Sequence, residues 1–332
     1  MRLLKPACLC LLSSWLLTSA AFGSEPVRYL VEIDNTWSTT THPEAFHDSL
    51  SHFSWVGGGT HNDQLELWQV NELASPGMVQ MAESGETTIL LDEVQAAVEQ
   101  GMALSKIDQP HWFCPEETVV DQCGPNQFEI ELSTDFDHVS LVTMLGPSPD
   151  WFVGVSGLPM RDEKGWINRT VHTLYPYDGG TRAANVLEMR GPLTEPPDPI
   201  THITSESGQV ISDRPIGSLI FTRIVECDLD GDFECGGADI DMLVEPFNNP
   251  DFDLDGSGTT DQDDRNFWIE NLMGTTIGDV DLDQDVDFAD FTQLAMNYNQ
   301  SGGWASGDFD GSGQTDFKDF LGLAMNLSLI HI

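Results

Sequence analysis

Basic residues are scarce in this chain of 332 residues, which has 13 Lys and Arg against 55 Asp and Glu and a formal net charge of −42. So much negative charge repels a phosphate backbone, which excludes nucleic acid as a partner. The most apolar segment, residues 9–17, is much shorter than the roughly 20 residues of a spanning helix. No HExxH, P-loop or Ser/His/Asp signature occurs either, which argues against the common enzyme classes.

The first 23 residues are typical of a secretory signal peptide. Arg2 and Lys5 form a charged region, residues 9–17 an apolar core, and residues 21–23 (Ala-Phe-Gly) a small-residue cleavage site before Ser24. We therefore expect a soluble mature protein that is secreted and works extracellularly or at a cell surface, with no transmembrane segment in this chain.

The six cysteines fall into three sequence-local pairs, of which the first lies inside the signal peptide. The other two pairs are Cys114 with Cys123 and Cys227 with Cys235. In an oxidising compartment these pairs are expected to form disulfides, and four free thiols are the alternative.

Negative charge is concentrated in residues 226–326, where 25 acidic residues face only Arg265 and Lys318. A blocked acidic run would indicate a disordered tail, but here the acids alternate in four windows that each close on an Asp. Calcium takes about six to eight oxygens, which a loop of about 12 residues supplies from positions 1, 3, 5, 7, 9 and 12. The predicted ligands are Asp228, Asp230, Asp232 and Asp239; Asp253, Asp255, Ser257, Asp261 and Asp264; Asp279, Asp281, Asp283, Asp287 and Asp290; and Asp308, Asp310, Ser312, Asp316 and Asp319.

A calcium loop of this kind turns sharply at position 6, where Gly is preferred. Gly258 and Gly313 fill that position in the second and fourth loops, but Phe233 and Gln284 fill it in the first and third. We therefore expect the first and third sites to be weaker or distorted. An apolar stretch with helical periodicity follows each loop.

These loops resemble dockerin-type and related bacterial EF-hand-like repeats, in which Asp closes the loop. The resemblance covers residues 226–326 and implies a small α-helical domain that binds Ca²⁺. Cohesin partners recognise dockerins through small hydroxylated residues just before the closing Asp. At those positions this chain has Phe288-Ala289 and Phe317-Lys318. A calcium-rigidified structural module or stalk and a cohesin-like docking domain are both open interpretations.

Residues 29–225 indicate mainly β structure. Short alternating runs predict strands at 29–35, 64–70, 128–132, 139–145, 151–155 and 219–225. Gly and Pro clusters at 57–59, 76–77 and 179–180 are interpreted as turns, and one helix is predicted at 92–100. Many short strands with one helix predict an antiparallel two-sheet sandwich.

Two segments of this region each place an acidic residue in a turn at the end of an apolar run: 147–154 (PSPDWFVG) and 174–180 (LYPYDGG). Together with further segments in the same order, they resemble the spondin domain, the N-terminal module of F-spondin and mindin-type matrix proteins. The resemblance implies a C2-like β-sandwich with a divalent cation and adhesion or matrix contact through its loops. The further segments are 35–38 (NTWS), 41–43 (THP), 52–54 (HFS), His61, 67–68 (LW), 74–77 (ASPG) and 82–85 (AESG).

The resemblance also implies which residues hold that cation. They are Asp150 and Asp178 of the two segments and Glu131 on the preceding strand. The simpler interpretation is that the two Asp side chains cap turns, as Asp often does. Residues 157–160 lack a Cys that the family usually has, and Arg182 replaces an acidic residue, so the disulfides and the ligand-facing rim differ from the family pattern.

Three further features of the sequence have other interpretations. His42, His47, His52 and His61 are clustered but match no standard zinc spacing. The carboxylates proposed for the metal could instead serve a hydrolase, although they suit metal ligation better. Residues 327–332 (LSLIHI) match the translation of a sequencing-adapter end, so they are interpreted as an artefact and the natural chain is expected to continue beyond Asn326.

The sequence thus predicts four segments: a signal peptide (1–23), a spondin domain (24–225), dockerin-like EF-hand repeats (226–326) and the artefact (327–332). The predicted function is that of a secreted, non-enzymatic, calcium-dependent adhesion protein of the extracellular-matrix type, with an extracellular protein or glycan as ligand. The alternative is an accessory glycan- or protein-binding module that docks to a larger complex through a cohesin-like partner.

Overall fold

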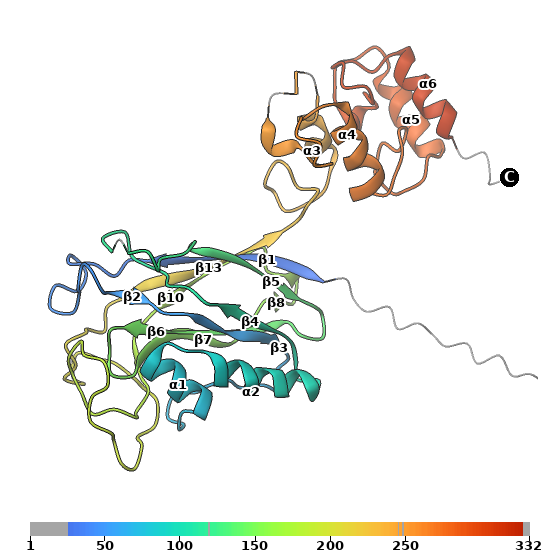
Figure 1. Cartoon of the computed structure of the whole chain (residues 1–332). Coiled ribbons are helices and arrows are strands. Elements are labelled where there is room, and N and C mark those ends of the chain that lie inside the picture. Colours follow the sequence, from blue (N-terminus) through green and yellow to red (C-terminus); the bar gives the residue numbers. More distant parts are fainter. Residues whose placement is uncertain (1–25, 119, 245, 248, 328–332) are drawn as a thin grey trace, which may run out of the picture.

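The chain forms a β-sheet lobe followed by a smaller helical lobe (Figure 1). The computed structural model describes residues 26–327 except 119, 245 and 248. The predicted signal peptide and residues 328–332 of the predicted artefact lie outside the described residues. No helix in this described part combines the length and the apolar character that a membrane span requires.

The first sheet of the β lobe has four antiparallel strands. Its order is β10 (Arg169–Leu174), β13 (Gly217–Ile224), β1 (Val27–Asn35) and β5 (Gln127–Leu132). Burial alternates strictly along β5, so Phe128 and Ile130 point into the molecule while Glu129 and Glu131 point out. This alternation is what a sheet with one solvated face requires.

The second sheet lies against the first and is covered on its other face by two helices (Figure 1). Because both faces are covered, β6 is buried almost throughout, which an alternating pattern could not achieve. The order of this sheet is β12 (Thr201–His202), β11 (Tyr177–Asp178), β7 (Trp151–Pro159), β6 (His138–Gly146), β3 (Val56–His61) and β4 (Ala103–Gln109), and β2 (His52–Phe53) also pairs with β6. The two helices are α1 (Pro76–Ser84) and α2 (Thr88–Glu99). A separate two-stranded sheet is formed by β8 (Arg161–Asp162) and β9 (Gly165–Trp166).

Two apolar cores follow from these three layers. Tyr29 and Phe221 of the first sheet meet Leu141 of the second in the core between the sheets. Met78 and Val94 of the two helices pack on the opposite face of the second sheet. The predicted antiparallel β lobe is confirmed, with a helical layer that the sequence analysis reduced to one helix.

The glycines at 57–59 were interpreted as a turn, and that interpretation is wrong. They lie inside β3, where all six residues are buried. A Cβ on Gly57 would lie 2.7 Å from Cγ2 of Thr87, and one on Gly59 would lie 2.7 Å from Cγ1 of Val94. Glycine is needed here because helix α2 packs directly on the strand, not because the chain turns.

Three other element predictions also need correction. Residues 76–77 were interpreted as a turn but begin helix α1, which was missed. The predicted helix at 92–100 is the second half of α2. The strand predicted at 64–70 is absent, and the described backbone there is irregular. The apolar residues of that segment have another role, because Trp68 packs edge-on against Phe152 and Tyr177 with centroids 5.1 and 4.8 Å away.

The helical lobe is built on one core and not on four separate repeats. Its elements are α3 (Gly237–Met242), η1 (Pro250–Phe252), α4 (Gln262–Phe267), η2 (Trp268–Leu272), α5 (Phe288–Asn297), η3 (Trp304–Ser306) and α6 (Phe317–Asn326). Trp268 and Trp304 are fully buried in it together with Leu294 and Leu323. The predicted helical stretches after the loops are therefore confirmed as short helices.

Candidate metal sites

Each of the four Asp loops closes by the same set of hydrogen bonds. Asp264 is the third residue of α4, and its Oδ2 accepts the N–H of Asp261 at 2.7 Å while its Oδ1 accepts the N–H of Leu254 at 2.6 Å. The closing residues Asp239, Asp290 and Asp319 make equivalent bonds. The closing carboxylate, buried in every loop, thus ties the N-cap of each helix to the start of its loop. In the last three loops the N-cap is an Asp whose own side chain completes a capping box.

Position 6 has one conformation in all four loops. Its φ is +69° at Phe233, +91° at Gly258, +77° at Gln284 and +84° at Gly313. The position-6 N–H donates to the first Asp of its loop in every case, at 2.6 to 2.8 Å. The distortion expected in the first and third loops is therefore absent, although two non-glycine residues hold a backbone conformation that favours glycine.

A second glycine position was missed by the sequence analysis. Position 4 also has a positive φ, at Gly231, Gly256 and Gly311 and, in the third loop, at Leu282 with +60°. The glycines that align at position 4 in three of the loops could have revealed it. The third loop is the one loop with a non-glycine residue at both positions.

The carboxylates at positions 1, 3 and 12 converge in every loop. In each triad the ligand atoms lie within 4.8 Å of one another, so these Asp triads could bind metal ions. They are Asp228, Asp230 and Asp239; Asp253, Asp255 and Asp264; Asp279, Asp281 and Asp290; and Asp308, Asp310 and Asp319. Asp287 instead groups with Asp290 and with Asp285, which the sequence analysis had not proposed. Of the other predicted Asp ligands, Asp232, Asp261, Asp283 and Asp316 are not in these groups. The predicted ligand Ser312 lies beside its triad, with Oγ 3.3 Å from Oδ1 of Asp308, whereas the hydroxyl of Ser257 lies 3.2 Å from the carbonyl of Thr259.

The electrostatics of the triads fit a hard cation. Burial and then the neighbouring Asp319 and Asp310 raise the pKa of Asp308, because like charges oppose ionisation. Oδ1 of Asp253 is buried and has no hydrogen-bond partner within the described structure. Lys318 Nζ reaches Asp310 at 2.7 Å but is itself exposed. Carboxylate oxygens that are buried and uncompensated are the ligands that calcium takes.

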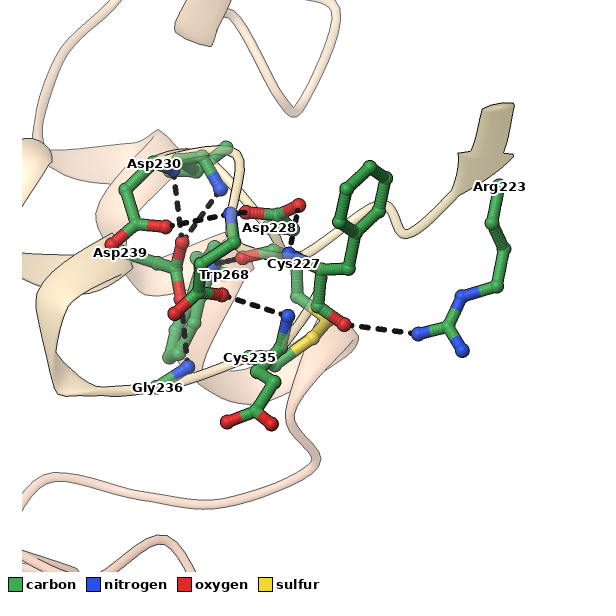
Figure 2. The surroundings of a disulfide bond; sticks show 12 residues. Arg223, Cys227, Asp228, Asp230, Cys235, Gly236, Asp239 and Trp268 are labelled. Atoms are coloured by element: carbon green, nitrogen blue, oxygen red, sulfur yellow. Dashed lines mark hydrogen bonds between the residues drawn. A yellow bond between two sulfur atoms is a disulfide. The ribbon is translucent and has the colours of Figure 1, made fainter. Parts of the chain in front are cut away.

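The first loop is also held by a disulfide (Figure 2). Cys227 precedes the first Asp of the loop and Cys235 lies at position 8, with Cα atoms 5.4 Å apart. Trp268 Nε1 donates to the carbonyl of Cys227 at 2.9 Å, and Arg223 Nη2 donates to the carbonyl of Phe233 at 2.9 Å. The second pair, Cys114 and Cys123, is bonded in the β lobe, so both expected disulfides are present.

A separate acidic pair lies at one end of the β lobe. Asp178 on β11 stands opposite Trp151, and Asp150 is the residue before β7. Oδ2 of Asp150 accepts the N–H groups of Thr181 at 2.7 Å and Arg182 at 2.9 Å. Asp178 accepts the N–H of Gly180 at 2.8 Å and the side-chain amide of Gln209 at 2.8 Å. Both Asp side chains therefore organise the turn at 179–182, as the simpler interpretation requires.

Turn capping does not account for the whole of Asp150. Its side chain is fully buried, and Oδ1 has no hydrogen-bond partner within the described structure. Burial and the neighbouring Asp178 raise the pKa of Asp150 to about 6, and burial raises the pKa of Asp178. A cation at the orphaned oxygen would offset both effects.

The third predicted ligand of this pair does not reach it. Glu131 is exposed, and in the strand register it stands opposite Arg28 near the start of β1. Asp178 follows β10, whose last residue Leu174 stands opposite Gly217 of β13. Gly217 in turn stands opposite Asn35, at the other end of β1. Glu131 therefore lies on the outer surface at the opposite end of the sandwich, and its prediction as a ligand of this site is wrong. The nearer acid is one the sequence analysis missed, Asp198, which lines a pocket of about 700 Å³ with Asp178 and Arg182.

Arg182, where the sequence departs from the family pattern, also has a structural role. Its guanidinium forms an ion pair of 2.5 Å with Glu83 of α1 and donates to the carbonyl of Gly191 at 3.1 Å. Among the described residues, His42, His47, His52 and His61 enter no group of three or more candidate metal ligands.

Fold and sites together define an antiparallel β-sandwich module with acidic turns at one end, followed by a small helical lobe of Asp loops. The chain belongs to the spondin N-terminal domain family, Spondin_N, whose profile matches residues 27–212. It is 31% identical to human spondin-2 over 199 residues, which is 59% of this chain and 57% of spondin-2. It is 30% identical to rat spondin-1 over 182 residues, 54% of this chain and 22% of that protein. The chain thus spans little more than half of spondin-2 and about a fifth of spondin-1.

Proposed function

We propose that this protein is a secreted, non-enzymatic adhesion protein whose spondin sandwich binds a matrix or cell-surface ligand through calcium-ordered turns. Asp150 carries the proposal, because its buried carboxylate has an unpartnered oxygen and a raised pKa and holds a pocket-lining turn of a spondin-family domain. Calcium would supply the missing charge. Asp150 and Asp178 would hold it, and the carboxylate of Asp198 lies close enough to Asp178 to raise its pKa.

The second part of the proposal is that residues 226–326 are an EF-hand-like lobe that takes calcium in the four triads. The support is the repeated closure of each loop on a buried Asp and the absence of compensating cations around three of the four triads in the described residues. When bound, calcium supplies positive charge that the clustered carboxylates lack. The lobe would then act as a rigid support for the sandwich.

Calorimetry on the full chain tests the two parts separately. Asp150→Asn with Asp178→Asn should remove calcium sites of the sandwich and leave those of the lobe. Asp264→Asn should remove a site of the lobe and leave the sandwich unchanged. Adhesion to isolated matrix, measured with calcium and with chelator, should fall for the sandwich variant. Equal adhesion of the sandwich variant and the parent chain would overturn the adhesion mechanism.

A second candidate function is an accessory module that docks to a larger complex through the helical lobe. Its support is an exposed apolar face repeated in α5 and α6, which share the pattern FxDFxxLAMN at 288–297 and 317–326. Phe288 is 74% exposed and Phe317 59% exposed. Their rings continue through Phe291 and Phe320, with centroids 5.8 to 6.4 Å apart.

A cohesin-like module is the proposed partner of that face. Its test is binding of purified cohesin modules to the calcium-loaded chain, with Phe288→Ser and Phe317→Ser as variants. Both residues are exposed, so the variants should fold as the parent does. Absence of binding to the parent chain would remove this candidate and leave the adhesion proposal untouched.

A further inference from the structure

A second pocket lies on the β lobe and shares no lining residue with the pocket of Asp178 and Asp198. Its volume is about 460 Å³, within the size range of small-ligand pockets. It opens between β2, the end of β6 and the turn that joins α1 to α2. Met144 and Gly146 form part of its buried lining, and Leu50 and Met189, about half exposed, stand at its rim.

Two tryptophans and a histidine give this pocket an aromatic wall. Trp55 and Trp112 both line it and are both partly exposed. The His52 ring stacks on Trp112 with centroids 3.5 Å apart and planes 13° apart. A Cβ on Gly146 would collide with this imidazole, so glycine at that position lets the stack form. The indole of Trp112 is therefore held in place before any ligand arrives.

His52 and Glu86 bring hydrogen-bond acceptors to the pocket, beside the indole donors of Trp55 and Trp112. His52 Nδ1 lies 2.6 Å from the carbonyl of Leu50, so it carries the proton and Nε2 is left as an acceptor. Burial lowers the pKa of His52, which keeps the ring neutral at neutral pH. Glu86 adds an exposed carboxylate at the rim. Of the described residues that line the pocket, Glu86 alone is charged at neutral pH, and none is Lys or Arg.

The single negative charge and the aromatic wall together favour a cationic ligand. An anion would find no cation to neutralise it, whereas ammonium and guanidinium groups have only donors and match acceptors. Such groups also bind to the faces of tryptophans. We propose that this pocket binds the side chain of a Lys or Arg presented by a basic protein partner, with the aliphatic stem against Trp55 and Trp112 and the charged group at Glu86. The net charge of −42 favours such a partner over long range.

The test uses the full chain in excess calcium and physiological salt, so that the Asp loops do not take up the probes. The probes are the Nα-acetyl methylamides of lysine, arginine and norleucine, which differ in charge at similar length. Calorimetry should show the lysine and arginine probes binding about tenfold more tightly than norleucine. The indole N–H signals of Trp55 and Trp112, assigned with Trp→Phe variants, should shift in the NMR spectrum.

Two variants with matched controls locate the effect. Glu86→Gln should abolish most of the preference for the cationic probes, while Glu99→Gln, an exposed Glu at the far end of α2, should not. Trp55→Leu should weaken the binding of all three probes, while Trp166→Leu, outside the pocket, should leave it unchanged. Equal affinity for norleucine and lysine, an unchanged preference in Glu86→Gln, or no binding of any probe would overturn the proposal. Glu86 is exposed, so its variant remains informative if Trp55→Leu fails to fold.

Discussion

Leu282 and Gln284 are the residues at which the third Asp loop departs most from the other three. Both hold a positive φ, +60° and +77°, that glycine adopts freely and other residues adopt at a cost of roughly 1–2 kcal/mol. The hydrogen bond from the Gln284 N–H to Asp279, 2.8 Å long, requires this conformation. The loop therefore keeps its geometry at the expense of stability.

Replacing these residues by glycine should stabilise the lobe. We expect Gln284→Gly to raise the free energy of unfolding by about 1 kcal/mol, because the strain is removed and the position-6 hydrogen bond is kept. Urea unfolding in saturating calcium, followed by far-UV circular dichroism, measures the change. The reverse substitution in the second loop, Gly258→Gln, should destabilise by a similar amount. A loss of stability in Gln284→Gly would contradict the account.

Buried histidines should make the β lobe sensitive to acid. His61 is fully buried between the carbonyl of Asn62 at 2.7 Å and Ser140 Oγ at 2.8 Å. Burial lowers its pKa, and the nearby His138 lowers it further. The unfolded chain, with a His pKa of about 6.5, then takes up the proton first. Stability is fully present above that pH and is lost as pH falls through the lower folded pKa.

Thermal unfolding between pH 7.5 and 5 checks this expectation. The midpoint should fall with pH, and His61→Gln should reduce the slope, since the amide does not titrate in this range. The scans use saturating calcium because, with calcium bound as proposed, Asp150 and Asp178 stay ionised across this range and do not contribute. A midpoint that stays constant across the range would show that His61 is not the titrating group.

At the scale of elements, the first Asp loop is the one whose shape depends most on a covalent bond. It has Gly236 at position 9, where the other loops have Asp, and Phe233 at position 6. The disulfide from Cys227 to Cys235 spans the segment that carries the first two carboxylates. Closing a loop of this length raises the free energy of the unfolded chain by about 2–3 kcal/mol, because it removes conformational entropy.

Removing that disulfide should weaken one calcium site and not the others. We expect Cys227→Ser with Cys235→Ser to reduce the affinity of one of the lobe's sites by at least about tenfold, because the loop must be ordered at binding. Calcium calorimetry measures it. The matched control is Cys114→Ser with Cys123→Ser, which removes the disulfide of the β lobe. If both pairs changed the lobe's affinities alike, the disulfide would have no specific role in the loop.

On the scale of the whole molecule, the helical lobe should respond to calcium as one unit. Arg265 follows the closing Asp of the second loop, and its guanidinium donates to the carbonyls of Ile240 at 2.7 Å and Leu243 at 2.9 Å. It also reaches the carbonyl of Phe309 in the fourth loop at 3.2 Å. Trp304 Nε1 donates to the carbonyl of Asp279 in the third loop at 2.8 Å. These contacts join all parts of the lobe.

Chelator should therefore melt the lobe in a single step and leave the β lobe folded. Without metal, the clustered carboxylates repel one another across a small core. Far-UV circular dichroism should lose helical signal on addition of chelator and recover it with calcium in one transition. The near-UV signal of the sandwich tryptophans should persist. A helical signal that does not change with chelator would contradict calcium-dependent folding.

The sequence by itself determined whatever depends on local spacing. The Asp loops, their helices, the two short-range cysteine pairs and the turn carboxylates Asp150 and Asp178 could be predicted because each is defined within about 12 residues. Position 4 of the loops could also have been aligned, as position 6 was. Tertiary structure alone decided which distant residues meet. It placed Gly57 and Gly59 under a helix, and Glu131 at the end of the sandwich opposite Asp178. Strand pairing and layer packing join residues far apart in the chain, and local spacing carries no information on them.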